Sequence, residues 1–240
     1  ELRAAGKIKE SRKLAAEANR LSPTLVPAAL LVAHGHFEQG KIKLATRTLC
    51  AAWLLEPHPE LAAGLAAIVP DENPAERLKR FMIITKIKPT HPETKMLLAE
   101  LNIAVGKYKA ARLALGGLAQ SDPTMRSLTI MAAIERGDGA DDQSVRQLLT
   151  QAISAQRDPQ WICDNCGDVH QSWEPLCLNC QAIDTIGWKR PPQSDAVSPQ
   201  ILPLIVGHLS PLDQSIPIVV LEAEVEALDE LGPTDVETKT

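Results

Sequence analysis

Aromatic residues are scarce in this sequence, since Phe, Trp and Tyr together make up 3% of its 240 residues. The cores must therefore be built from Leu, Ala, Ile and Val, a composition that favours helices over sheets. No apolar run reaches the ~18–20 residues that a membrane-spanning helix needs, so we expect this portion to be soluble. No nucleophile–base pair, phosphate-binding glycine loop or carboxylate pair stands out, and we therefore predict no enzymatic activity.

The net charge of −5 is unevenly distributed along the chain. Residues 191–240 hold nine Asp and Glu against one Lys, a net charge of −8, so residues 1–190 carry +3. A net-acidic chain is a poor general binder of nucleic acid, and we predict no nucleic-acid partner. The acidic segment also contains seven prolines without a repeat period. This composition predicts a disordered tail over residues 191–240.

Cysteines are few, and four of the five lie within eighteen residues, from Cys163 to Cys180. Secreted disulfide frameworks usually spread their cysteines through a small domain, whereas most of this chain is cysteine-poor. A reducing compartment is therefore favoured, with the clustered thiols engaged by a metal ion. The fifth cysteine, Cys50, is expected to be a small buried apolar residue.

Prolines recur at a near-constant interval in the first 160 residues. They are Pro23, Pro57, Pro89, Pro123 and Pro159, which lie 32 to 36 residues apart. A unit of about 34 residues is typical of helix–turn–helix repeats. Gly40 and Gly106 are expected to open the turns between paired helices, because positive φ is easiest for glycine, and each proline ends a second helix. The expected helices span residues 7–20, 25–38 paired with 41–55, 59–68 with 75–87, 92–104 with 107–119, and 124–136 with 143–156.

These units resemble the tetratricopeptide repeat family. The matching residues are Ala33, Gly40, Ala45, Ala52 and Pro57 in one unit, and Ala99, Gly106, Ala111 and Pro123 in another. The early large aromatic residue of the family is missing, and Ala29 and Lys95 stand in its place. The resemblance covers residues 1–158 and implies a helical repeat solenoid whose groove binds a protein partner. The alternative is that helices of similar length produced this spacing by chance.

The clustered cysteines form two CxxC pairs, Cys163 with Cys166 and Cys177 with Cys180. Two residues between cysteines let a tight turn aim both sulfurs at one point, and Gly167 permits the turn after the second sulfur. Four thiolates in tetrahedral directions suit zinc, or iron in a rubredoxin-like site, and leave no open position for hydrolytic chemistry. His170 is a possible substitute ligand, although four cysteines already complete the coordination sphere. The miniature core is expected to comprise Trp161, Trp173, Ile183, Ile186 and Trp188.

The whole arrangement resembles the carboxy-terminal part of the HemY-type proteins of proteobacteria. The matching segments are Trp-Ile-Cys-Asp-Asn-Cys-Gly from Trp161, Trp-Glu-Pro-Leu-Cys-Leu-Asn-Cys from Trp173 and Asp-Thr-Ile-Gly-Trp from Asp184. It is similar in plan to the lipopolysaccharide-assembly protein LapB, which also joins tetratricopeptide repeats to a rubredoxin-like knuckle. The second knuckle departs from the rubredoxin pattern, with Leu178 and Gln181 where proline and glycine are usual. The resemblance implies association with the inner membrane through an anchor absent from this chain, a cytoplasmic face for the repeats, and a link to haem biosynthesis.

We therefore predict an all-α fold class: a tetratricopeptide-like solenoid over 1–158, a small rubredoxin-like zinc ribbon over 159–190, and the tail. The leading functional hypothesis is a non-enzymatic protein-binding scaffold with a structural zinc ion at Cys163, Cys166, Cys177 and Cys180. The second hypothesis is an electron carrier with iron at the same four thiolates. A nucleic-acid-binding ribbon ranks last, because residues 161–190 carry four acids against Lys189 and Arg190.

Overall fold

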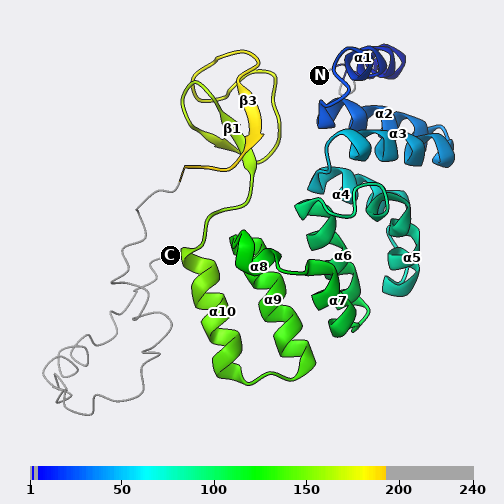
Figure 1. Cartoon of the computed structure of the whole chain (residues 1–240). Helices are drawn as coiled ribbons and strands as arrows, with labels where there is room; N and C mark the ends of the chain where they lie inside the picture. The colour runs from blue at the N-terminus through cyan, green and yellow to red at the C-terminus, as the bar shows by residue number, and fades with distance from the viewer. Residues whose placement is uncertain (1, 3–4, 193–240) are drawn as a thin grey trace, which may run out of the picture.

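The computed structural model describes residue 2 and residues 5–192. In this part of the chain ten helices follow an arc, and a small sheet lies opposite the first half of that arc (Figure 1). The helices are α1 (Ile8–Leu21), α2 (Val26–Glu38), α3 (Ile42–Leu55), α4 (Pro59–Ile68), α5 (Pro74–Thr85), α6 (Pro92–Ala104), α7 (Tyr108–Leu115), α8 (Leu118–Ser121), α9 (Met125–Asp138) and α10 (Asp142–Ser154). The predicted tail falls almost wholly outside the described residues.

Helix starts recur at a fixed interval along the arc. The N-cap residues of α2, α4, α6 and α9 are Leu25, His58, His91 and Thr124, each 33 residues after the one before. The two histidines act in the same way, since the Nδ1 of each accepts a hydrogen bond from the backbone N–H two residues later. A proline follows each histidine at the first helical position, where its missing N–H costs nothing.

Glycines with positive φ separate the closely paired helices, as the sequence predicts. Gly40 between α2 and α3 has φ 69°, and Gly106 between α6 and α7 has φ 75°. The predicted single helix over 107–119 is interrupted at residues 116–117. Gly116, with φ 59°, ends α7, and a short α8 follows. With φ 59° and ψ −141°, Gly116 lies in a backbone region that is essentially restricted to glycine, so a glycine at this position permits the break.

The expected pairing of 59–68 with 75–87 is also wrong. The closest helix pairs are α2 with α3, α6 with α7 and α9 with α10, whereas α5 contacts α3 and α6. The side chain of Arg80 lies between α4 and α5, where it donates to the Leu65 carbonyl at 2.8 Å and pairs with Glu72. This bond connects α5 to α4, and both helices contribute to one apolar core although they do not form a close pair.

Two apolar cores fill the arc, as expected for an alanine- and leucine-rich chain. The first is centred on Trp53, Leu49 and Phe81, and the second on Leu115, Met131 and Ile134. Small residues allow the close approach of the paired helices: Ala29, Ala45, Ala99 and Ala111 are all fully buried. Cys50 is half-buried and packs against the first core, in line with an apolar role.

The chain after α10 forms a three-stranded antiparallel sheet, so an all-α class describes only residues 8–154. The strands are β1 (Gln160–Cys163), β2 (Val169–His170) and β3 (Ile186–Lys189), in the order β2-β1-β3. Trp161 pairs with His170 on one side and with Trp188 on the other. We call residues 160–190 the ribbon. The Asp158 carboxylate fixes its entry point, because it accepts bonds from the Thr124 hydroxyl and the Arg126 N–H at the start of α9.

Candidate metal centre

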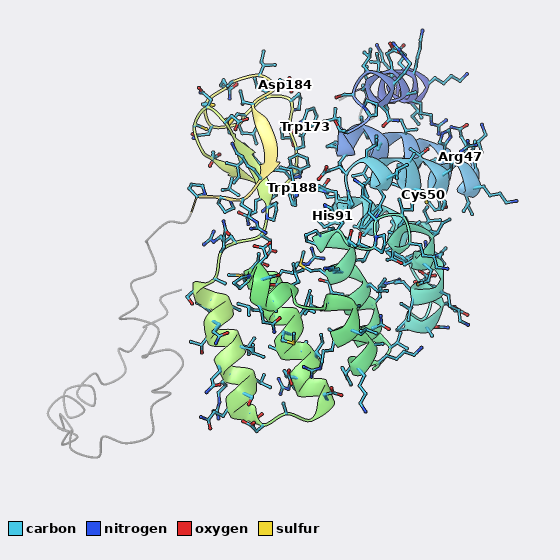
Figure 2. The ribbon with its side chains drawn as sticks, viewed as in Figure 1. Arg47, Cys50, His91, Trp173, Asp184 and Trp188 are labelled. Atoms are coloured by element: carbon cyan, nitrogen blue, oxygen red, sulfur yellow. The ribbon has the colours of Figure 1, made fainter. Side chains whose placement is uncertain are left out.

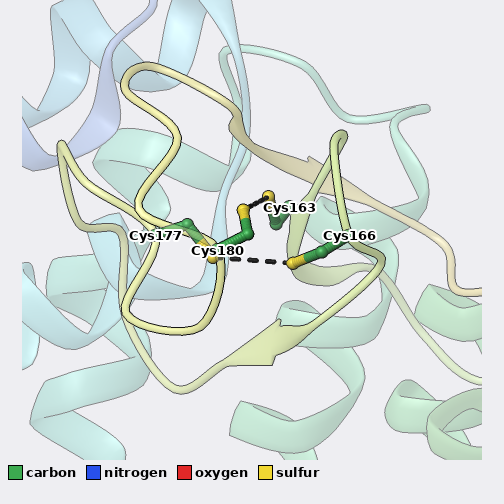
Figure 3. A group of neighbouring side chains, drawn as sticks. All are labelled: Cys163, Cys166, Cys177 and Cys180. Carbon is green, nitrogen blue, oxygen red and sulfur yellow. Dashed lines mark hydrogen bonds between the residues drawn. The ribbon is translucent and has the colours of Figure 1, made fainter.

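The four cysteine sulfurs converge on one point between the two knuckles of the ribbon (Figure 3). The Sγ atoms of Cys163 and Cys180 lie 3.7 Å apart, as do those of Cys166 and Cys177. A tetrahedral ion with metal–sulfur bonds of about 2.3 Å places its sulfurs about 3.8 Å apart. The predicted cluster is therefore formed at a size that could hold one metal ion. Zinc and iron fit these distances equally well.

Each knuckle is a turn closed by a backbone hydrogen bond across the CxxC pair. Gly167 N–H donates to the Cys163 carbonyl, and Gln181 N–H donates to the Cys177 carbonyl, both at 2.9 Å. The residue after each second cysteine has positive φ, 75° at Gly167 and 59° at Gln181. The predicted role of Gly167 is confirmed. Gln181 adopts the same conformation at the steric cost that a glycine avoids.

The surroundings of the sulfurs favour the thiolate form of Cys163 over that of Cys166. The Thr185 hydroxyl, 3.2 Å from the Cys163 sulfur, is the main cause that lowers the pKa of Cys163 to about 6. For Cys166 the Asp168 amide favours the thiolate, but desolvation and the other sulfurs outweigh it and raise the pKa to about 11. Four thiolates at this distance repel one another, so a divalent cation is what allows all four to ionise together.

His170 contacts the cluster from β2. Its Nε2 lies 3.3 Å from the Cys177 sulfur and 3.7 Å from a carboxylate oxygen of Asp168. The His170 side chain is only 6% exposed, so it belongs to the immediate surroundings of the sulfurs and not to the surface. The sequence singled out His170 as a possible substitute ligand, and the fold brings it within reach of Cys177.

The miniature core differs from its prediction at one residue. Trp161 and Ile186 are buried with Cys163 and Cys177, and Trp173 and Trp188 pack against them. Ile183, however, is 76% exposed, because it lies in the loop between the second knuckle and β3. So small a core leaves the ribbon dependent on other sources of stability.

One such source is a contact with the helical arc that the sequence did not indicate. His58, the N-cap of α4, is only 1% exposed and lies against two indole rings of the ribbon. Its ring centroid is 4.1 Å from that of Trp188 and 5.3 Å from that of Trp161. The Trp161 Nε1 donates to Glu60 at 2.6 Å. At the far end of β3, Arg190 pairs with Asp122 and donates to Gln156.

The ribbon and the arc together enclose a cavity of about 560 Å³. Figure 2 shows Trp188, on the edge of the ribbon, and His91, at the start of α6, close to each other, and both line this cavity. The other lining residues are Glu56, Pro57, Pro59, Pro92, Glu93, Met96, Leu118, Asp122, Thr124, Arg126, Asp158, Pro159 and Arg190. The cavity thus lies where the starts of α4, α6 and α9 meet the ribbon.

The cavity is lined by more acids than bases. Four carboxylates face two arginines, and burial lowers the pKa of His91, an effect that Glu56 opposes. Arg126 donates to Glu93 and to Glu100, both at 2.8 Å, so it is already neutralised. Burial raises the pKa of Glu93, an effect that Arg126 opposes. Glu56 is exposed and contributes one of the four carboxylates to the wall.

No helix among residues 5–192 combines the length and the apolar character needed to cross a membrane. No protein-family model matches the chain. The chain is 29% identical over 179 residues to the probable magnetosome protein Mms48 of Magnetospirillum gryphiswaldense. The match covers 74% of this chain and 40% of that protein, so the chain spans about two fifths of the relative's length.

Proposed function

We propose that this chain is a non-enzymatic protein-binding scaffold in which a structural zinc ion at the four cysteines holds the ribbon in place. The observation that carries the proposal is the cavity of about 560 Å³ that the ribbon and three helix starts form jointly. A metal site of four thiolates offers no open position for a substrate, which favours a structural ion. Because the ribbon and the helices both line the cavity, an ion that keeps the ribbon folded would also maintain the binding site.

The arc is proposed to be a tetratricopeptide-like repeat array. The recurrence of N-caps every 33 residues at Leu25, His58, His91 and Thr124 supports this proposal, as do the glycine turns at Gly40 and Gly106. Arrays of this kind present a continuous inner surface to an extended partner.

The proposed partner is an extended protein segment that carries a basic side chain beside an apolar one. Met96, Leu118 and Trp188 offer apolar surface, and the exposed Glu56 offers a carboxylate. Electrostatic complementarity of this kind contributes more to the specificity of binding than to its affinity.

A charge-reversal pair tests this site. Glu56 is exposed and lines the cavity, whereas Glu76 is exposed at the start of α5, outside it. The full chain and its Glu56→Arg and Glu76→Arg variants are used to recover partners from native membranes and soluble extract, with metal analysis of the same samples. A specific partner that Glu56→Arg loses and Glu76→Arg keeps, with one zinc per chain, supports the proposal. Equal recovery by all three chains would contradict it.

The second candidate is an electron carrier with iron at the same four thiolates. Cys166 is exposed, which brings one sulfur of the cluster to the surface where an electron could leave. Chain purified from native cells is expected to be red and to show reversible one-electron chemistry under this hypothesis. A colourless, zinc-loaded preparation rules it out.

Association with the inner membrane, a cytoplasmic face and a link to haem biosynthesis are proposals that rest on the HemY resemblance alone. On the similarity to a probable magnetosome protein, association with a magnetosome is a further proposal. Because that relative is aligned over 40% of its length, its role as a whole protein is carried over only as a proposal.

A further inference from the structure

A second group of metal ligands lies beside the four-cysteine cluster. The carboxylate of Asp168, the Nε2 of His170 and the Sγ of Cys177 all lie within 4.8 Å of one another. The three residues come from three places: the end of the first knuckle, β2, and the start of the second knuckle. Carboxylate, imidazole and thiolate are the three side-chain types that zinc accepts.

The distances suit a bound ion. Zinc bonds of about 2.0–2.1 Å to nitrogen and about 2.3 Å to sulfur, at a tetrahedral angle, place those two atoms about 3.5 Å apart. The His170 Nε2 and Cys177 Sγ are 3.3 Å apart. Bonds to nitrogen and to a carboxylate oxygen give about 3.4 Å by the same reasoning, and the observed separation is 3.7 Å between His170 and Asp168.

The charge at this point favours a second cation. Four thiolates around one divalent ion leave a net charge of −2, and the Asp168 carboxylate adds another. A second divalent ion would reduce this excess, and a thiolate retains lone pairs with which to bridge two ions. The Asp168 side chain is 44% exposed, so an ion can enter from the solvent side although Cys177 is buried and the His170 side chain is only 6% exposed.

We propose that Asp168, His170 and Cys177 form a second site for a borderline divalent cation such as Zn²⁺ or Co²⁺, which shares the Cys177 sulfur with the four-cysteine centre. The remaining coordination position is open to solvent. The proposal rests on the proposed metal occupancy of the four cysteines. In this proposal the His170 Nε2 binds the second cation. The alternative is that it only donates a hydrogen bond to the Cys177 thiolate.

Metal stoichiometry of the full chain tests the second site. The reduced, metal-free chain is titrated with Co²⁺ and followed by its absorption, and with Zn²⁺ and followed by calorimetry. We expect a first, tighter equivalent with strong thiolate-to-cobalt absorption, and a second, weaker equivalent that perturbs that absorption. His170→Ala and Asp168→Asn should each keep the first equivalent and weaken the second at least about tenfold, because each removes one ligand.

Asp184→Asn is the matched control, since Asp184 is an exposed carboxylate of the same ribbon outside this group, and asparagine tolerates its positive φ of 56°. That variant should keep both equivalents. A single equivalent in the parent chain, or a second one that survives His170→Ala, overturns the second site and leaves the four-cysteine centre intact. If no equivalent binds with thiolate absorption, the metal centre in the proposed function fails as well.

Discussion

The indole N–H of Trp161 donates a hydrogen bond of 2.6 Å to the carboxylate of Glu60, a residue 101 positions earlier in the chain. Trp161 belongs to β1 and pairs with the strand that carries Trp188, whereas Glu60 lies in the first turn of α4. The bond therefore fixes the ribbon to the arc at the place where His58 contacts both indole rings. It also determines where one wall of the cavity stands.

Removal of the Glu60 carboxylate should loosen this contact. Glu60→Ala leaves the indole N–H without its acceptor, and a buried donor without a partner costs about 1–3 kcal/mol. Urea unfolding of the zinc-loaded chain measures the loss. In a double-mutant cycle with Trp161→Phe, which keeps most of the ring, we expect a coupling energy of about 1–2 kcal/mol.

The control is Glu76→Ala, which removes a carboxylate from the first turn of α5 without touching the ribbon. Its effect should stay within about 0.5 kcal/mol, as for most exposed sites. Additive effects of Glu60→Ala and Trp161→Phe would show that the hydrogen bond contributes nothing to docking.

Acid should weaken the same contact through His58. Burial lowers the pKa of His58 to about 4, from an ordinary value near 6.5, and its Nε2 has no hydrogen-bond partner among the described residues. The folded chain thus binds this proton less readily than the unfolded chain. The contribution of neutral His58 to the free energy of unfolding is fully present above about pH 6.5. It decreases as the pH falls towards 4, by up to about 3 kcal/mol, since each pKa unit is worth about 1.4 kcal/mol.

His58→Asn separates this effect from the titration of carboxylates. Asparagine still caps α4 but cannot take a proton, so the free energy of unfolding should depend less on pH between 6.5 and 4.5, although it starts lower. His91→Asn is the comparison, because His91 caps α6 in the same way but is less buried. An unchanged pH slope in His58→Asn would contradict the assignment.

Local sequence signals predicted most of the helices and the cysteine cluster. The starts and ends of the helices depend on nearby prolines and glycines such as Gly40 and Gly106, and the two CxxC turns depend on four-residue segments. Such features are encoded within a few positions of where they act. The break at Gly116 has the same local origin, although the expected helix over 107–119 ran through it.

No local sequence signal predicted that the ribbon docks on the arc. His58 is a lone histidine before a proline, and its burial results from two tryptophans more than 100 residues later. Glu60 likewise has the sequence features of an ordinary first-turn carboxylate. The cavity arises from the same long-range contact, so the sequence could indicate a groove on the repeats but not the wall that the ribbon contributes.

If the four cysteines hold zinc, as proposed, its removal should unfold the ribbon and leave the arc folded. Two of the four buried residues in the ribbon core are cysteines, Cys163 and Cys177. A structural zinc ion contributes on the order of 10–16 kcal/mol to so small a unit. After chelation, amides of β1 and β3 should exchange hydrogen rapidly while those of α3 stay protected, because α3 belongs to a separate apolar core.

Cys177→Ser provides the same test without a chelator, and Cys50→Ser is its matched control, since Cys50 lies in α3 and far along the chain from the ribbon. Zinc content should fall only in Cys177→Ser. Continued protection of β1 and β3 in metal-free chain would mean that the docking on His58 and Glu60 is sufficient to fold the ribbon.

A glycine at position 181 should make the metal centre more stable. Gln181 has φ 59°, and the equivalent residue of the first knuckle is Gly167 with φ 75°. The left-handed conformation costs a non-glycine residue about 1–2 kcal/mol. A glycine also raises the conformational entropy of the unfolded chain, which lowers the free energy of unfolding by about 0.4–1 kcal/mol. Gln181→Gly should therefore gain a few tenths of a kcal/mol up to about 1 kcal/mol, seen as slower zinc loss to a chelator.

Gly167→Ala is the reverse substitution at the matching position of the first knuckle, where an added Cβ meets no atom within 4 Å. It should speed zinc loss through backbone strain alone, with no steric clash to confuse the result. If both variants lose zinc at the parent rate, the positive φ at Gln181 carries no strain, and the departure from glycine in the second knuckle has no energetic consequence.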